Sequence, residues 1–156
     1  MNTIVAVNNI NITRRFFVSS KNLYSNVFNN TSMLIINRNF IRPFVVNIKN
    51  LVVNITLPSI HNNVYYLVIS GLTNTNVFNS LRIENRNINE VNPNDNIIVQ
   101  IPIFNGGYIK ESALSEQYNG PNMISQLDIK FVSDTGCILS NNDVEYYFTL
   151  ELVEMN

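Results

Sequence analysis

Apolar and polar residues alternate with a period of two along most of this chain. The clearest example lies near the C-terminus, where Tyr146, Phe148 and Leu150 fall on one face of a strand and Tyr147 and Thr149 fall on the other. A period of two is typical of a half-buried β-strand, whereas an amphipathic helix repeats every 3.6 residues. The pattern therefore predicts a protein built from β-strands.

Nine or ten short strands are expected from this alternation. The stronger candidates are residues 44–48, 51–57, 64–70, 97–103, 127–131 and 145–154, and the weaker ones are residues 3–7, 13–19, 33–36 and 77–84. Clusters of Asn, Asp, Gly and Pro separate the candidates, and these residues favour turns. Among them, residues 105–107 predict a tight turn and residues 85–95 a long surface loop. Only residues 111–117 have a pattern that suits a helix.

Many short strands without crossover helices indicate an antiparallel sandwich or barrel. We therefore expect an all-β fold, an antiparallel β-sandwich that forms a single jelly roll of about eight core strands. An immunoglobulin-like sandwich is the alternative, although the chain lacks its Cys–Trp–Cys signature. Residues 21–156 would form the jelly-roll domain, and residues 1–20 either an N-terminal arm or the first strand.

Composition argues against several classes of protein. Ten Lys and Arg residues oppose eleven Asp and Glu residues, so no excess of positive charge is present to bind nucleic acid. A single Cys excludes a disulfide within the chain, and a single His excludes a two-His metal site and most His-centred triads. We expect no enzyme, and hence no catalytic residues, no cofactor and no metal.

The beginning of the chain has no basic region and no continuous apolar segment, so we expect no signal peptide. The apolar runs elsewhere are far too short to span a membrane, and no membrane partner is expected. His61 lies in a predicted turn and is expected at the surface. Cys137 begins a short apolar segment and is expected to be a small buried residue.

Asparagine replaces much of the usual charge, with thirty Asn residues and only 13% charged residues in the chain. An AT-rich genome would favour Asn, but a weakly charged surface also promotes association between copies. The adjacent pairs 65–66 and 146–147 are both Tyr–Tyr, so one Tyr of each pair points outward from its strand. We expect a subunit interface to involve four residues: Arg14, Arg15, Tyr66 and Tyr147.

The C-terminal third of the chain carries a family resemblance. Residues 124–139, with the sequence ISQLDIKFVSDTGCIL, lead through a polar loop into residues 144–154, with the sequence VEYYFTLELVE. This arrangement resembles the closing strands of small jelly-roll capsid proteins from eukaryotic double-stranded DNA viruses, the polinton, adintovirus and virophage group. Residues 108–120 resemble the connecting stretch that precedes those strands. The resemblance covers about fifty residues.

The resemblance implies a structural protein of a virion, or a host-captured descendant of one. Such a capsid subunit acts by self-assembly, as a penton or as a minor or cementing subunit, and its expected partners are further copies of itself and the major capsid protein. Two, three and five copies all remain open. The alternative function is a carbohydrate- or receptor-binding jelly-roll module that uses Tyr and Asn side chains. A cupin-like enzyme would need several metal-binding His residues, which one His does not supply.

Overall fold

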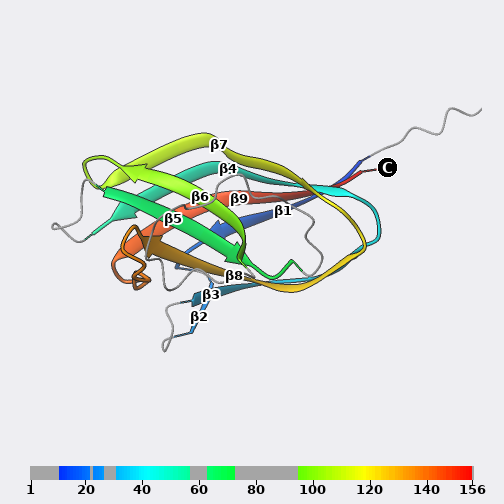
Figure 1. The fold of residues 1–156 in the computed structure, drawn as a ribbon, viewed down its shortest axis with the longest axis horizontal. Coiled ribbons are helices and arrows are strands. Elements are labelled where there is room, and N and C mark those ends of the chain that lie inside the picture. Colours follow the sequence, from blue (N-terminus) through cyan, green and yellow to red (C-terminus); the bar gives the residue numbers. More distant parts are fainter. Residues whose placement is uncertain (1–10, 22, 27–30, 57–62, 73–94, 156) are drawn as a thin grey trace, which may run out of the picture.

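The computed structural model of the protein describes residues 11–21, 23–26, 31–56, 63–72 and 95–155. This part of the chain contains nine strands and no helix (Figure 1). The strands are β1 (Ile12–Ser19), β2 (Tyr24–Asn26), β3 (Thr31–Phe40), β4 (Phe44–Ile55), β5 (Asn63–Ser70), β6 (Asp95–Ile103), β7 (Gly107–Tyr118), β8 (Asn122–Ser133) and β9 (Val144–Glu154).

The strands form two antiparallel sheets that pack face to face. Sheet A has the order β1-β9-β4-β7, and sheet B has the order β2-β3-β8-β5-β6. The three-residue strand β2 only extends the edge of sheet B beside β3. The other eight strands divide equally between the sheets, and the chain crosses from one sheet to the other at most connections. This is the strand order of a jelly roll, which confirms the predicted fold.

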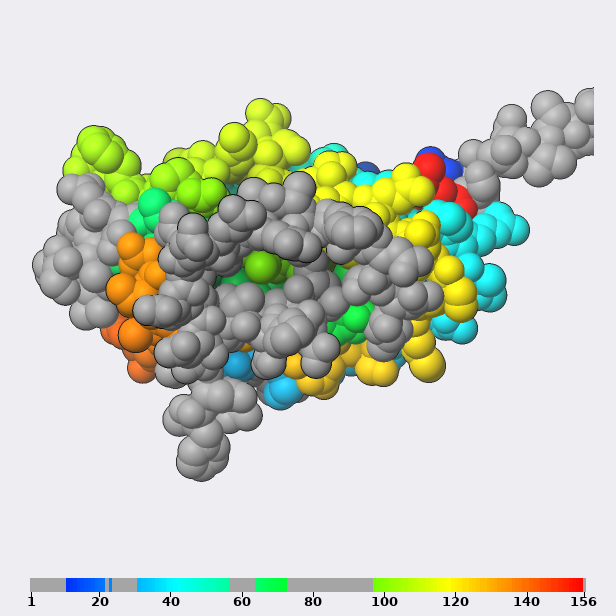
Figure 2. Space-filling model, in the orientation of Figure 1, coloured from blue at the N-terminus to red at the C-terminus, as the bar shows by residue number. Residues whose placement is uncertain are grey.

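The first and last described strands, β1 and β9, pair with each other in sheet A. Ile12 of β1 and Phe44 of β4 both pair with Glu154 of β9, and the Met155 N–H donates to the Pro43 carbonyl at 2.9 Å. Figure 2 shows the beginning of β1, in blue, beside the end of the last strand, in red, at one end of the molecule. The beginning of β1 is therefore anchored to the sandwich by its pairing with the last strand.

Most predicted strands are present and are longer than predicted. Residues 13–19, 33–36, 64–70, 97–103, 127–131 and 145–154 lie in β1, β3, β5, β6, β8 and β9 respectively. Residues 44–48 and 51–57 were expected as two strands, but residues 44–55 form the single strand β4. Asn50 interrupts it with φ +52°, where the pairing register shifts. A β-bulge at this position restores the inward direction of the side chains after the interruption.

The helix predicted for residues 111–117 is wrong, because this segment lies within β7. Most of the stretch that resembles a family connection, residues 108–120, also lies within β7. β7 is an edge strand, and residues 109–112 are exposed without alternation. This segment is a strand because it pairs with β4 over nearly its whole length. Pairing between segments far apart in the sequence cannot be predicted from the local pattern of residues. Residues 3–7, 77–84 and 85–94 lie outside the described residues.

The core consists of the inward side chains of both sheets. Its aromatic rings stack within and between the sheets: Phe131 of β8 lies 5.5 Å from Tyr65 of the neighbouring strand β5 and 6.4 Å from Tyr146 of β9 in the other sheet, centroid to centroid. Tyr146 in turn lies 6.2 Å from Phe148. Offset stacking of this kind adds to the hydrophobic stabilisation of two packed sheets.

The predicted tight turn joins the two sheets. Asn105 and Gly106 have φ values of +52° and +78°, and the flanking residues Phe104 and Gly107 exchange two N–H···O bonds of 3.2 Å. Left-handed φ at both central residues is typical of a type I′ turn, which Asn-Gly favours. The sequence therefore predicted both the position and the chemistry of this corner between β6 and β7.

A glycine after β5 provides a test of this packing. Gly71 has φ +128°, and a Cβ atom there would lie 2.3 Å from the backbone oxygen of Gln126. We expect Gly71→Ala to lower the free energy of unfolding by about 2–3 kcal/mol, because it adds backbone strain and displaces β8. The measurement is urea denaturation followed by circular dichroism.

The matched control is Gly107→Ala. A Cβ atom at Gly107 would meet its nearest neighbour, Asn54 Oδ1, at an ordinary 3.7 Å. This variant should change the free energy of unfolding by less than about 1 kcal/mol. Equal stabilities for the two variants would contradict the close packing of Gly71 against β8.

Candidate functional site

The outer face of sheet A is the first candidate surface. We call it face A, meaning the residues of β1, β9, β4 and β7 that point away from sheet B. Because side chains alternate along a strand, each of these strands contributes one set of residues to the core and the other set to face A. On β9, for example, Tyr146, Phe148 and Leu150 are buried in the core, and Tyr147 and Glu151 lie on face A.

A carboxylate held by two cations lies in the middle of face A. Glu151 Oε2 accepts a hydrogen bond from Arg15 Nε of β1 at 2.7 Å, and Glu151 Oε1 lies 2.8 Å from Lys49 Nζ of β4. The two cationic side chains reach across from the strands on either side and leave Glu151 only 6% exposed. Hydrogen bonds from Lys49 and then from Arg15 lower the pKa of Glu151 below its ordinary value.

Apolar side chains extend across face A from one edge to the other. Phe17 on the edge strand β1 is 84% exposed, and Ile109 on the opposite edge strand β7 is 78% exposed. Between them, Val52 of β4 pairs directly with Tyr147 of β9 on one side and with Ile109 on the other. Face A therefore combines a carboxylate paired with two cations and apolar side chains on all four strands. Phe17 and Ile109 are the exposed ones, and Phe17 itself pairs with Thr149 of β9.

A cavity of about 500 Å³ at one end of the sandwich is the second candidate site, which we call the end pocket. It is lined by Ser20, Lys21, Leu23, Thr56, Asn141, Asn142, Val144 and Glu145. These residues come from the end of β1, the end of β4 and the connection into β9. The end pocket adjoins face A at Glu145, which lines the pocket and lies on the outward side of β9.

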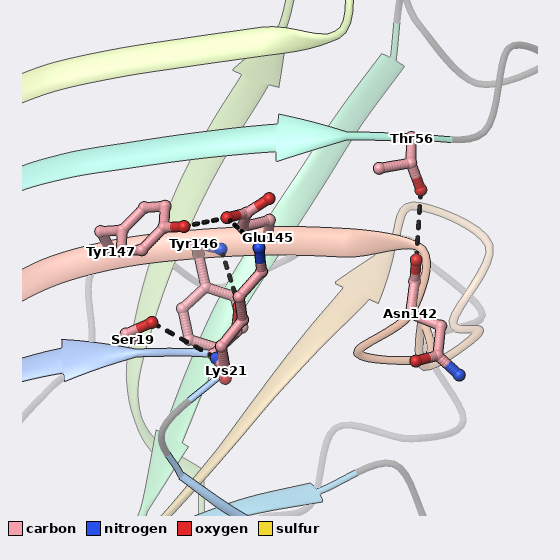
Figure 3. A network of polar contacts seen from close by, with 8 residues as sticks. Ser19, Lys21, Thr56, Asn142, Glu145, Tyr146 and Tyr147 are labelled. Carbon is pink, nitrogen blue, oxygen red and sulfur yellow. Dashed lines mark hydrogen bonds and ion pairs between the residues drawn. The ribbon is translucent and has the colours of Figure 1, made fainter.

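Polar contacts shape the end pocket (Figure 3). The Lys21 ammonium lies 3.0 Å from Glu145 Oε1, and Glu145 also bonds to the Tyr147 hydroxyl. The Thr56 hydroxyl is directed to the backbone oxygens of Asn142 and Asp143, at 3.2 and 3.0 Å. The pocket thus presents an ammonium, a carboxylate and amide groups, which suit a ligand with several hydroxyl groups.

The structure brings together two of the four residues predicted for a subunit interface. Arg15 and Tyr147 both lie on face A. Arg14 is half-buried and points to the opposite side of β1, toward the core. Its pairing partner on β9 is Leu152, which is buried in the core. Tyr66 points outward from sheet B but is only 3% exposed, in a small cluster with Val68 and Val132. Its burial leaves it without an open surface for a second subunit.

Four residues of face A were missed at the level of sequence: Phe17, Lys49, Ile109 and Glu151. Phe17 follows Phe16, and the rule applied to the two Tyr pairs would have placed one of these rings outward. Lys49 and Glu151 gave no such signal, because their contact depends on the register between β4 and β9. Ile109 lies in the segment whose strand was not recognised.

The expectation that Cys137 is buried is wrong, since its side chain is exposed. Cys137 lies in the turn after β8, where its N–H donates to Ser133 Oγ at 3.1 Å and Leu139 is the buried apolar residue instead. His61 lies outside the described residues. Within the described ranges, no group of three or more His, Cys, Asp or Glu residues could hold a metal ion.

Comparison with family models, with curated proteins and with solved structures gives no significant match for this chain. No helix long and apolar enough to cross a membrane occurs in the described part of the chain.

The carboxylate of face A gives a pH-dependent prediction. Because the pKa of Glu151 is lowered in the folded state, its ion pairs contribute stability at pH values above its ordinary pKa of 4.5. That contribution is lost as the pH falls through the lowered pKa. We expect Glu151→Gln to lower the free energy of unfolding by about 1 kcal/mol at pH 7, and the difference from the wild type to disappear in acid.

Urea denaturation at a series of pH values from neutral to acidic measures this difference. Glu111→Gln is the control, because Glu111 is exposed on β7 outside the Arg15–Glu151–Lys49 cluster. A Glu151→Gln variant whose stability parallels that of the wild type at every pH would contradict the ion pairs.

Proposed function

We propose that the chain is a structural protein of a virion, a capsid subunit that acts by self-assembly. The observation that carries the proposal is the strand order of sheets A and B, in which eight strands form a single jelly roll. The segment whose sequence resembles small viral capsid proteins forms β8, the following turn and β9. The resemblance therefore falls on consecutive strands of the sandwich rather than on an isolated motif.

The proposed role is that of a penton or of a minor or cementing subunit in the virion, with further copies and the major capsid protein as partners. A rigid sandwich provides a subunit whose shape is set before assembly. Its surface supports association, because the large apolar side chains of Phe17 and Ile109 are exposed on a weakly charged chain. A host-captured descendant of such a subunit would associate by the same surfaces.

The test is the mass of the purified chain by size exclusion with light scattering, over a range of concentration and salt. We expect a discrete oligomer of 17.8 kDa subunits that forms as the concentration rises, and closed rings or particles by electron microscopy. The oligomer should persist in salt, since its contacts are largely apolar. A strict monomer at the highest concentration would contradict self-assembly.

The end pocket favours a second function, the binding of carbohydrate. Its volume lies within the range of small-molecule sites, and Lys21, Asn142 and Glu145 offer donors and acceptors for vicinal hydroxyl groups. Tyr147 bonds to Glu145 at the border with face A and could add an aromatic surface for a sugar ring. In this function the jelly roll is a recognition module that holds the pocket at one end.

A glycan array followed by calorimetry tests this second function. We expect a bound sugar whose affinity falls at least about tenfold in Asn142→Ala, because the amide is removed from the pocket. Asn119→Ala is the matched control, since Asn119 is exposed just after β7 and does not line the pocket. Absence of any glycan binding by the wild type would contradict this function.

A further inference from the structure

We infer that face A is the surface through which one copy of this chain binds a second copy. The inference rests on the proposed function, because it names the contact that self-assembly would use. Phe17 and Ile109 are the two most exposed large apolar side chains of the described residues, and both lie on face A.

The apolar groups span the whole width of sheet A. Phe17 and Ile109 lie on its two edge strands, β1 and β7, and the half-buried side chains of Tyr147 and Val52 lie on the two central strands. Single exposed apolar residues are common on soluble proteins, but a set that crosses an entire sheet is typical of a surface covered by a partner. An aromatic ring at such a surface also matches the composition of protein interfaces.

The carboxylate at the centre of face A does not oppose burial of that face. Both oxygens of Glu151 already have cationic partners, Arg15 and Lys49, and the carboxylate is removed from water before any partner arrives. A docking copy would therefore leave no unpaired buried carboxylate, which is the costly case. The cluster carries one more positive than negative charge, and a second copy offers exposed carboxylates such as Glu111 to complement it.

The area of face A is sufficient for a specific contact. Four strands spaced by about 4.8 Å and a β1 strand of eight residues, rising about 3.4 Å each, give a face of about 500 Å². Two such surfaces bury about 1,000 Å² in total, which reaches the lower limit for a specific protein–protein interface. A small peptide would cover only part of the face, whereas the flat surface of a second copy would cover all of it.

The experiment compares two pairs of matched variants in the full chain. Phe17→Glu and Ile109→Glu place a charge on face A. Phe104→Glu and Ile41→Glu make the same changes at side chains that are 74% and 71% exposed but lie in connections between the sheets. Light scattering over a concentration series gives the dissociation constant for self-association, and thermal unfolding shows that each variant is folded.

We expect each face A variant to raise the dissociation constant at least about 100-fold, because a charge would be buried among apolar groups. The two control variants should assemble like the wild type. If a glutamate prevents folding, Phe17→Thr and Ile109→Thr replace it, since Thr is polar and retains a high β-propensity. Weakened assembly in folded face A variants, with unchanged controls, would support the inference.

Three outcomes would overturn the inference, and they can be told apart. If the wild type assembles and the face A variants assemble equally well, face A is not the contact, but self-assembly itself stands. If the wild type stays monomeric at every concentration, the proposed self-assembly fails and the contact fails with it. Assembly lost equally in the control variants would show that the loss does not depend on face A, and the assignment of the contact would fail.

Discussion

The pairing of β9 with both of its neighbours is the constraint on which the rest of the structure depends. β9 lies between β1 and β4, so the C-terminal strand joins the beginning of the described chain to its middle. Its inward residues Tyr146 and Phe148 complete the aromatic stack of the core. Its outward residues Tyr147 and Glu151 form the centre of face A. Its first two residues, Val144 and Glu145, line the end pocket. One strand therefore contributes to the core and to both candidate sites.

The chemistry of face A follows from this central position. An acidic residue on a central strand has neighbours on both sides, and Glu151 receives Arg15 from β1 and Lys49 from β4. Such an arrangement leaves the carboxylate in the middle of the face fully paired, while the edge strands carry Phe17 and Ile109. A face with a paired charge at its centre and apolar groups at its edges can be buried without leaving a carboxylate unpaired. This supports its use as a contact between copies.

The high content of asparagine acquires a structural meaning in this fold. Asn37, Asn50 and Asn105 all have positive φ, the first two where strand registers shift and the third in the turn between β6 and β7. Asn accepts left-handed backbone angles more readily than other residues with a side chain. In a chain with only five Gly residues, Asn thus serves at bulges and turns where Gly is common. This role stands beside genome composition and weak surface charge as a reason for its abundance.

Local sequence determined most of the strands, the tight turn at Asn105–Gly106 and the all-β class, because side-chain alternation and turn chemistry depend on neighbouring residues. It also indicated that one residue of each aromatic pair points outward. Only the tertiary structure decided that Tyr66 is buried while Tyr147 lies on an open face, and that β7 is a strand. It also decided that Arg15 meets Glu151, 136 positions further along the chain. These outcomes depend on which strands pair and in what register, and pairing is a property of segments far apart in sequence.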